Sequence, residues 1–198
     1  MNDLTRSPIE NIFTSISDKL SDKIYNLPLN RPPEPNNITT LGLLAALFSI
    51  FTLREGKIIL CVLFALFGQY LDNLDGYYAR KYKLDTKFGY YYDRIADNIK
   101  ILGLIFVFYI LYETKINIIH ILIFIALSLL GNLNFALRIR LKELNNEKYH
   151  YHLKPWNYLG KLFGSKENII KLTKFTRYFD ETSIFIYYLF AIVYFHYS

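Results

Sequence analysis

The chain has 198 residues, 53% of them hydrophobic, and a formal net charge of +6 at pH 7. This length suits one compact domain and is too short for two. A chain that is both apolar and basic has to keep the two kinds of residue apart along its sequence, so the composition favours an integral membrane protein over a soluble one. The one cysteine, Cys61, lies in an apolar run and excludes an intrachain disulfide.

Residues 1–34 are predicted to form an N-terminal segment of their own. Apolar side chains recur at helical spacing over residues 7–27 with charged residues between them, which is typical of an amphipathic helix on a membrane surface. A solvated helix packed on the protein itself is an equally good interpretation of this pattern. Three prolines within residues 31–35 then stiffen the chain, so we expect a linker before the next element.

Five apolar stretches follow, with lengths that fit membrane-spanning helices. They cover about residues 38–53, 58–78, 90–112, 116–137 and 183–197. A further segment, residues 159–179, is apolar but interrupted by five cations, and we interpret it as an interfacial or snorkelling helix. The expected fold is therefore an all-α integral membrane protein, a bundle of five to six transmembrane helices over residues 35–198 with an N-terminal amphipathic surface helix.

The basic residues are distributed unevenly between the two ends of these stretches. Residues 138–177 contain ten lysines and arginines and residues 80–87 contain four, whereas the opposite connectors hold Arg54, Lys57 and Lys115. Basic residues favour the cytoplasmic side. We therefore expect a multi-pass protein whose connector at residues 80–87 faces the cytoplasm.

Four aspartates lie at fixed spacing where the second and third apolar stretches meet. Residues three, four and seven apart share one face of a helix, so each half of the motif forms one stripe. Carboxylates at a membrane edge are costly and mark substrate or ion pathways, and Mg²⁺ or Mn²⁺ would relieve their repulsion. The motif reads Asp72-x-x-Asp75-Gly76-x-x-Ala79-Arg80, then eight residues, then Gly89-x-x-x-Asp93-x-x-x-Asp97.

This motif resembles the signature of the CDP-alcohol phosphatidyltransferases and meets all of its specified positions. A second stretch, residues 35–39, is similar to the P-N-x-I-T sequence that opens the first span in many members. The resemblance covers about residues 35–97 by motif and the remainder by hydrophobic layout. Members usually have six core spans, whereas five clear ones are counted here.

The resemblance implies a role for each matching residue. Asp72, Asp75 and Asp93 would bind a pair of Mg²⁺ or Mn²⁺ ions, and Asp97 would act as general base and partial metal ligand. The activity implied is transfer of a phosphatidyl group from a CDP-linked donor to an alcohol hydroxyl, with release of CMP, in phospholipid biosynthesis. The residues matching positions at the CDP donor are Pro35, Asn36, Asn37, Ile38, Gly76, Ala79, Arg80, Thr86 and Gly89.

The second half of the motif bears on the donor. The run from Asp93 to Asp97 resembles the D-x-x-A-D form of members that use CDP-diacylglycerol, whereas members that use CDP-choline tend to read D-H-x-x-D. We therefore expect CDP-diacylglycerol. A CDP-choline or CDP-ethanolamine type enzyme acting on diacylglycerol is the alternative, and a non-catalytic scaffold is a third. A divalent-metal transporter could also place carboxylates near a span end, but it leaves Gly76, Ala79 and Arg80 unexplained.

A second basic group, at Arg138, Arg140 and Lys142, has two interpretations. We favour an anchor that holds anionic lipid headgroups. The alternative is that Arg138 or Arg140 binds a phosphate on the acceptor. The expected partners are a CDP-linked lipid donor, an alcohol acceptor, membrane lipids and a second copy of the chain in a homodimer, with no nucleic acid.

Overall fold

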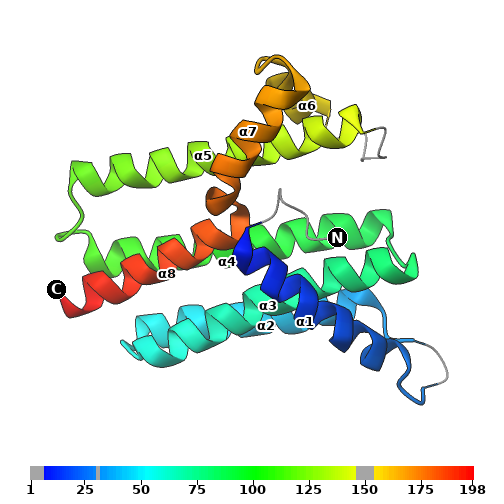
Figure 1. Ribbon diagram of the computed structural model, residues 1–198. Helices are drawn as coiled ribbons and strands as arrows, with labels where there is room; N and C mark the ends of the chain where they lie inside the picture. The colour runs from blue at the N-terminus through cyan, green and yellow to red at the C-terminus, as the bar shows by residue number, and fades with distance from the viewer. Residues whose placement is uncertain (1–6, 30–31, 146–153) are drawn as a thin grey trace. The chain divides into compact units, whose positions relative to one another are not determined.

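The computed structural model describes residues 7–29, 32–145 and 154–198. Every regular element in these residues is a helix, which confirms the predicted all-α class. Residues 1–6 and 30–31 of the predicted N-terminal segment lie outside the described ranges. In chain order the elements are α1 (Pro8–Tyr25), α2 (Pro35–Arg54), α3 (Ile58–Tyr82), α4 (Lys87–Tyr112), α5 (Ile118–Leu144), α6 (Lys154–Lys161), α7 (Lys166–Thr176), a 3₁₀ turn (Arg177–Phe179) and α8 (Glu181–Tyr197) (Figure 1).

Within the described residues, four helices are long and apolar enough to cross a membrane, namely α2, α3, α4 and α5. Their lengths of 20 to 27 residues match a hydrocarbon core of about 30 Å, because an α-helix rises about 1.5 Å per residue. This is the layout of a multi-pass membrane protein. The fifth predicted span corresponds to α8, which has 17 residues and stays a prediction.

α5 continues as a helix to Leu144, beyond the predicted apolar stretch, because Leu141 continues a buried face that packs against Ile169. One expectation about helix extent is wrong. The predicted single helix over residues 159–179 is broken between α6 and α7. Gly164 takes a φ of +78° there, and the Ser165 side chain then caps α7 by accepting a hydrogen bond from the Asn168 backbone at 3.4 Å.

By its internal packing the chain divides into two compact units. The motif unit comprises Ile12–Ile116 with Tyr188–Ser198 and contains α2, α3 and α4. The α5 unit comprises Asn117–Tyr187 with the described residues up to Asn11, and contains α5, α6 and α7.

Within the motif unit, α2 packs along α3 and also contacts α4. The contact between α2 and α3 is close, because a Cβ added to Gly68 would lie 3.2 Å from the carbonyl oxygen of Gly42 and 3.6 Å from the Ala45 Cβ. Small residues let two helix backbones approach in this way. Above this crossing, Thr39 of α2 comes to lie beside Asp75 of α3.

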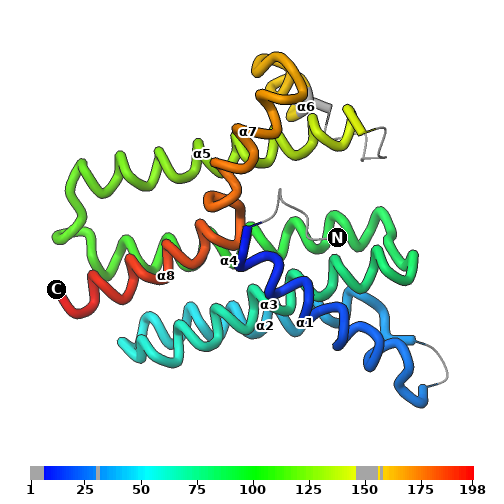
Figure 2. The backbone as a smooth tube through the Cα atoms, viewed as in Figure 1, coloured from blue at the N-terminus to red at the C-terminus, as the bar shows by residue number. Residues whose placement is uncertain are grey.

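A short turn joins α3 to α4 and reverses the chain, as Figure 2 shows. α3 ends at Tyr82, and the next residue, Lys83, takes a left-handed conformation with φ of 56°. α4 then begins after Thr86, whose hydroxyl accepts a hydrogen bond from the Gly89 backbone at 2.9 Å. The turn therefore brings the end of α3 and the start of α4 together, and these are the two helix ends that carry the aspartate motif.

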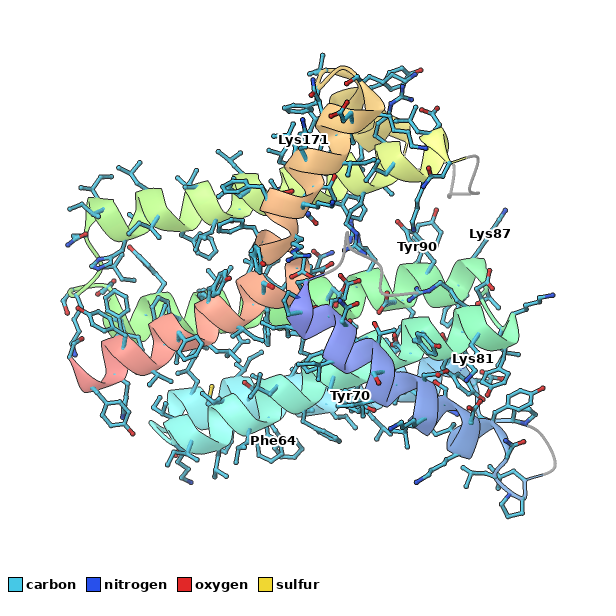
Figure 3. All side chains as sticks on the ribbon, viewed as in Figure 1. Phe64, Tyr70, Lys81, Lys87, Tyr90 and Lys171 are labelled. Atoms are coloured by element: carbon cyan, nitrogen blue, oxygen red, sulfur yellow. The ribbon has the colours of Figure 1, made fainter. Side chains whose placement is uncertain are left out.

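The residues of α1 from Ile12 onward pack on α3, because the ring of Phe13 contacts that of Tyr70 and Asp18 pairs with Lys81 (Tyr70 and Lys81 are labelled in Figure 3). Leu20 and Ile24 of α1 contact the buried cluster that contains Tyr78. Of the two interpretations of this segment, these contacts match a helix that packs on the protein itself. Ile12 and Ile16 remain exposed, so contact between α1 and a membrane surface stays a prediction.

In the α5 unit, α6 and α7 lie against α5 (Figure 1). Gly160 of α6 allows the closest approach, since a Cβ there would lie 2.8 Å from the Ala136 carbonyl oxygen. The N-terminal residues are bound to this unit through Ser7, whose hydroxyl donates to the buried Asp180 carboxylate at 2.7 Å.

Candidate active site

Three of the four motif aspartates converge between the C-terminal half of α3 and the N-terminal half of α4. Asp72, Asp93 and Asp97 each offer one carboxylate oxygen, and these oxygens lie within 4.8 Å of one another. All three side chains are partly buried. We refer to Asp72, Asp93 and Asp97 as the carboxylate cluster. Helical spacing accounts for the convergence, since Asp93 and Asp97 are one turn apart on α4 and the turn before α4 brings that face toward α3.

Asp75 lies beside the cluster but does not belong to the group of three. Its side chain is almost completely buried, at 2% exposure, and one carboxylate oxygen accepts a hydrogen bond from the Thr39 hydroxyl at 2.5 Å. The other oxygen, Oδ1, has no hydrogen-bond partner among the described residues. An unsatisfied buried carboxylate oxygen is costly. Asp75 Oδ1 is therefore an atom that a ligand would satisfy.

A lysine that the sequence analysis missed completes the site. The Lys100 ammonium donates to Asp72 Oδ1 at 2.9 Å and to Asp97 Oδ1 at 2.8 Å, and its side chain is 7% exposed. Gln69 donates to the second oxygen of Asp72 at 3.2 Å. The spacing held a signal, because Gln69 precedes Asp72 by three residues and Lys100 follows Asp97 by three, which extends both stripes.

A small pocket, partly open to solvent, lies between α2, α3 and α4 beside the carboxylates. Its lining includes Thr39, Gly42, Gly68, Asp72, Asp75, Ala96, Asp97 and Lys100.

The residues present fit a divalent cation such as Mg²⁺. All the candidate ligands are carboxylate oxygens, which hard cations prefer, and Asp75 supplies an unsatisfied one.

The family model described as CDP-alcohol phosphatidyltransferase matches residues 34–193. The chain belongs to the CDP-alcohol phosphatidyltransferase family. The matched range includes α2, the whole aspartate motif and the helices after it. Comparison with curated proteins and with solved structures gave no match.

Family membership gives the coarse function. The protein is a transferase of phospholipid biosynthesis that takes a CDP-alcohol donor and an alcohol acceptor, and its family uses divalent metal ions. This finding favours a phosphotransferase over the metal transporter considered above. It also leaves the choice of CDP-alcohol open, because the family includes donors of more than one kind.

The positions that match CDP-donor contacts in other phosphatidyltransferases have several structural roles here. A Cβ added to Gly89 would lie 3.0 Å from the Asn36 side-chain oxygen, so the start of α2 is packed against the start of α4. A Cβ added to Gly76 would lie 3.0 Å from the guanidinium of Arg80, which therefore folds back over the glycine. Ile38 is buried in the core of α2 and α3.

The remaining donor positions lie at the same helix ends. Pro35 and Asn37 are in the first turn of α2, and Asn37 is exposed. Ala79 is half-buried in the last turns of α3, and Thr86 caps α4. The predicted donor positions therefore surround the ends of α2, α3 and α4 that carry the carboxylates.

Arg138 and Arg140 lie in the α5 unit, where both pair with carboxylates. Arg138 makes two hydrogen bonds of 2.9 Å to the two oxygens of Glu10, and Arg140 pairs with Glu143. The Glu10 contact was missed because Glu10 is 128 residues away in sequence. Binding of a headgroup or of an acceptor phosphate at these arginines stays a prediction.

Proposed function

We propose that the protein transfers a phosphatidyl group from CDP-diacylglycerol to the hydroxyl of a small alcohol, with release of CMP. The observation that carries this proposal is the convergence of Asp72, Asp93 and Asp97 beside the buried Asp75 in a chain of this family. The D-x-x-A-D form of the motif supports the lipid donor over CDP-choline.

Asp72, Asp75 and Asp93 would hold two divalent cations, Mg²⁺ or Mn²⁺, with Asp97 as a partial ligand. Bound there, the ions would neutralise negative charge on the diphosphate and on the phosphoryl group during transfer. Arg80, folded over Gly76 at the end of α3, would contact the diphosphate. The start of α2 at Pro35, Asn36, Asn37 and Ile38 would lie along the cytidine, together with Ala79, Thr86 and Gly89.

Asp97 would act as the general base. It removes the proton from the acceptor hydroxyl while that oxygen forms a bond to the β-phosphorus of the donor. The bond between the β-phosphorus and the bridging oxygen breaks, and CMP leaves with that oxygen. The hydrogen bond from Lys100 to Asp97 Oδ1 orients the carboxylate for this task.

The location and assembly of the protein belong to the same proposal. The concentration of basic residues from the end of α3 to Lys87, and from the end of α5 to Arg177, supports a site that faces the cytoplasm. Residues 35–198 would form the transferase domain and residues 1–34 an interfacial segment. We also propose a homodimer.

The test is release of CMP by the purified protein in detergent. CDP-diacylglycerol is supplied with a panel of acceptors, namely inositol, a phosphorylated inositol, glycerol 3-phosphate and serine. We expect CMP with one of these acceptors in the presence of Mg²⁺ or Mn²⁺ and none with EDTA. CMP from CDP-choline and diacylglycerol, with none from CDP-diacylglycerol, would contradict the proposed donor.

A further inference from the structure

Lys100 lies deep in the motif unit, although the family signature does not specify it. Ala96, Lys100 and Leu104, each four residues apart, form the buried face of α4. A lysine is almost never fully buried unless it is paired. Lys100 is paired twice, with Asp72 of α3 and Asp97 of α4, so one ammonium group bridges the two helices that carry the motif.

The oxygens that Lys100 contacts belong to the residues that would bind the metal. Asp72 and Asp97 supply two of the three oxygens in the carboxylate cluster, and Lys100 donates to one oxygen of each. The ammonium therefore supplies positive charge to the cluster from one side. A divalent cation bound by the same carboxylates would be repelled by that charge at short range.

We propose that Lys100 is a positioning residue that acts as an internal counter-cation. It holds Asp72 and Asp97 together when no divalent cation is bound, and it lowers the affinity of the carboxylate cluster for the cation. The proposal rests on the proposed function in taking the cluster as the metal site. A weaker metal site exchanges its cation more readily, and the lysine keeps the carboxylates positioned during the exchange.

Two other residues serve as controls for the effect of the Lys100 charge. One tests the loss of a hydrogen bond alone, and the other tests the loss of an exposed ion pair. Gln69 is a neutral donor to the same Asp72 carboxylate. Lys81 is a second lysine between two aspartates, Asp18 and Asp22, but its side chain is 26% exposed and its partners are more exposed still. Solvent screens such a pair.

The experiment compares Lys100→Met and Lys100→Gln with Gln69→Leu, Lys81→Met and the unmodified protein, in detergent and without donor. The first measurement is the Tm in EDTA. Loss of the bridge leaves buried carboxylates without their cation, so we expect both Lys100 variants to melt about 5–10 °C below the unmodified protein.

The second measurement is a Mn²⁺ titration, with free Mn²⁺ followed by electron paramagnetic resonance. We expect the Kd for Mn²⁺ to fall at least about tenfold in both Lys100 variants.

Lys81→Met is expected to bind Mn²⁺ within about threefold of the unmodified protein, because it removes no charge from the cluster. Gln69→Leu removes a hydrogen bond to Asp72 but no charge, so it is not expected to tighten Mn²⁺ binding. Purification of Lys100→Met with Mn²⁺ but not with EDTA would also support the proposal. It would be overturned by an unchanged Tm in EDTA, or by Mn²⁺ binding that is unchanged or weaker in both Lys100 variants. The EDTA measurement needs neither donor nor metal, so it keeps its meaning if CMP release fails. Absence of Mn²⁺ binding in the unmodified protein would contradict the metal site of the proposed function instead.

Discussion

Two lysines of the motif unit each lie between two aspartates, but they differ in exposure and therefore in their expected contribution to stability. Around Lys81 the pairs are 2.6 and 2.7 Å long, and around Lys100 they are 2.9 and 2.8 Å long. The geometry is similar, but the Lys81 side chain is 26% exposed and the Lys100 side chain 7%. The partners are Asp18 and Asp22 for Lys81, and Asp72 and Asp97 for Lys100.

The difference shows how burial decides what an ion pair does. Exposed pairs are screened by water and contribute little to stability. Buried pairs cannot be broken on one side without leaving an uncompensated charge, which costs about 3–5 kcal/mol. The Lys81 group therefore attaches α1 to α3 weakly. The Lys100 group lies next to Asp75 and Asp93, where carboxylates outnumber lysines and a further cation can bind.

The largest effect is expected when the carboxylate cluster loses one of its proposed metal ligands. Asp93→Ala removes one oxygen donor from the carboxylate cluster, so CMP release should fall to background and Mn²⁺ binding should weaken. EDTA should have the same effect on the unmodified protein. Asp85→Ala, which changes an exposed aspartate in the turn before α4, should keep both properties. Full turnover by Asp93→Ala would show that Asp93 is not a required metal ligand.

Asp97→Asn is expected to separate chemistry from binding. An asparagine keeps the shape and one oxygen but cannot take the acceptor proton, so turnover should fall on the order of 10²–10⁴-fold. Metal-dependent binding of the CDP donor should remain, which equilibrium binding of a labelled donor would measure. If donor binding were lost as fully as in Asp93→Ala, Asp97 would be chiefly a metal ligand.

The sequence alone predicted the long apolar helices and the convergence of the motif aspartates. Apolar runs of about 20 residues predict spans, and spacing by three and four predicts that Asp93 and Asp97 share a face of α4. The motif then predicted that α3 and α4 bring their aspartates together, and the structure places Asp72 with the α4 pair. These predictions depend on residues close together in the chain.

The missed features depend on contacts between distant residues or on local backbone. Thr39 and Asp75 are 36 residues apart, and their hydrogen bond follows from the close packing of α2 on α3 at Gly42 and Gly68. Lys100 was counted within an apolar span, although its position three residues after Asp97 continues the aspartate stripe of α4. Its contact with Asp72 joins residues 28 apart in the sequence. The break before α7 depends on the left-handed conformation of Gly164, which an apolar pattern does not reveal.

A smaller effect is expected from Thr39→Val, which tests the buried Asp75 carboxylate by removing an uncharged hydrogen-bond donor. The substitution removes the hydrogen bond to Asp75 and leaves a second oxygen of this buried carboxylate unsatisfied. The free energy of unfolding in EDTA should fall by about 1–3 kcal/mol. Thr40→Val is the matched control, because Thr40 is exposed and bonds to Tyr92 instead. Equal losses in the two variants would show that burial of Asp75 is not the cause.

The smallest effect is expected at the exposed group. Hydrogen bonds from Lys81, and then from Tyr77 to Asp18 and from Tyr82 to Asp22, lower the pKa of both aspartates below the ordinary value of 3.8. A carboxylate with a lowered pKa in the folded state stabilises the fold above its unfolded pKa, and this contribution is lost as the pH falls through the folded value. Lys81→Met should therefore lower the Tm slightly at pH 7, far less than Lys100→Met does, and the difference from the unmodified protein should shrink below about pH 4. Thermal melts of Lys81→Met and the unmodified protein from pH 7 to pH 3 measure this difference. A loss at Lys81 as large as that at Lys100 would mean that α1 is attached to α3 by an interaction as strong as the buried one, and exposure would then not distinguish the two groups.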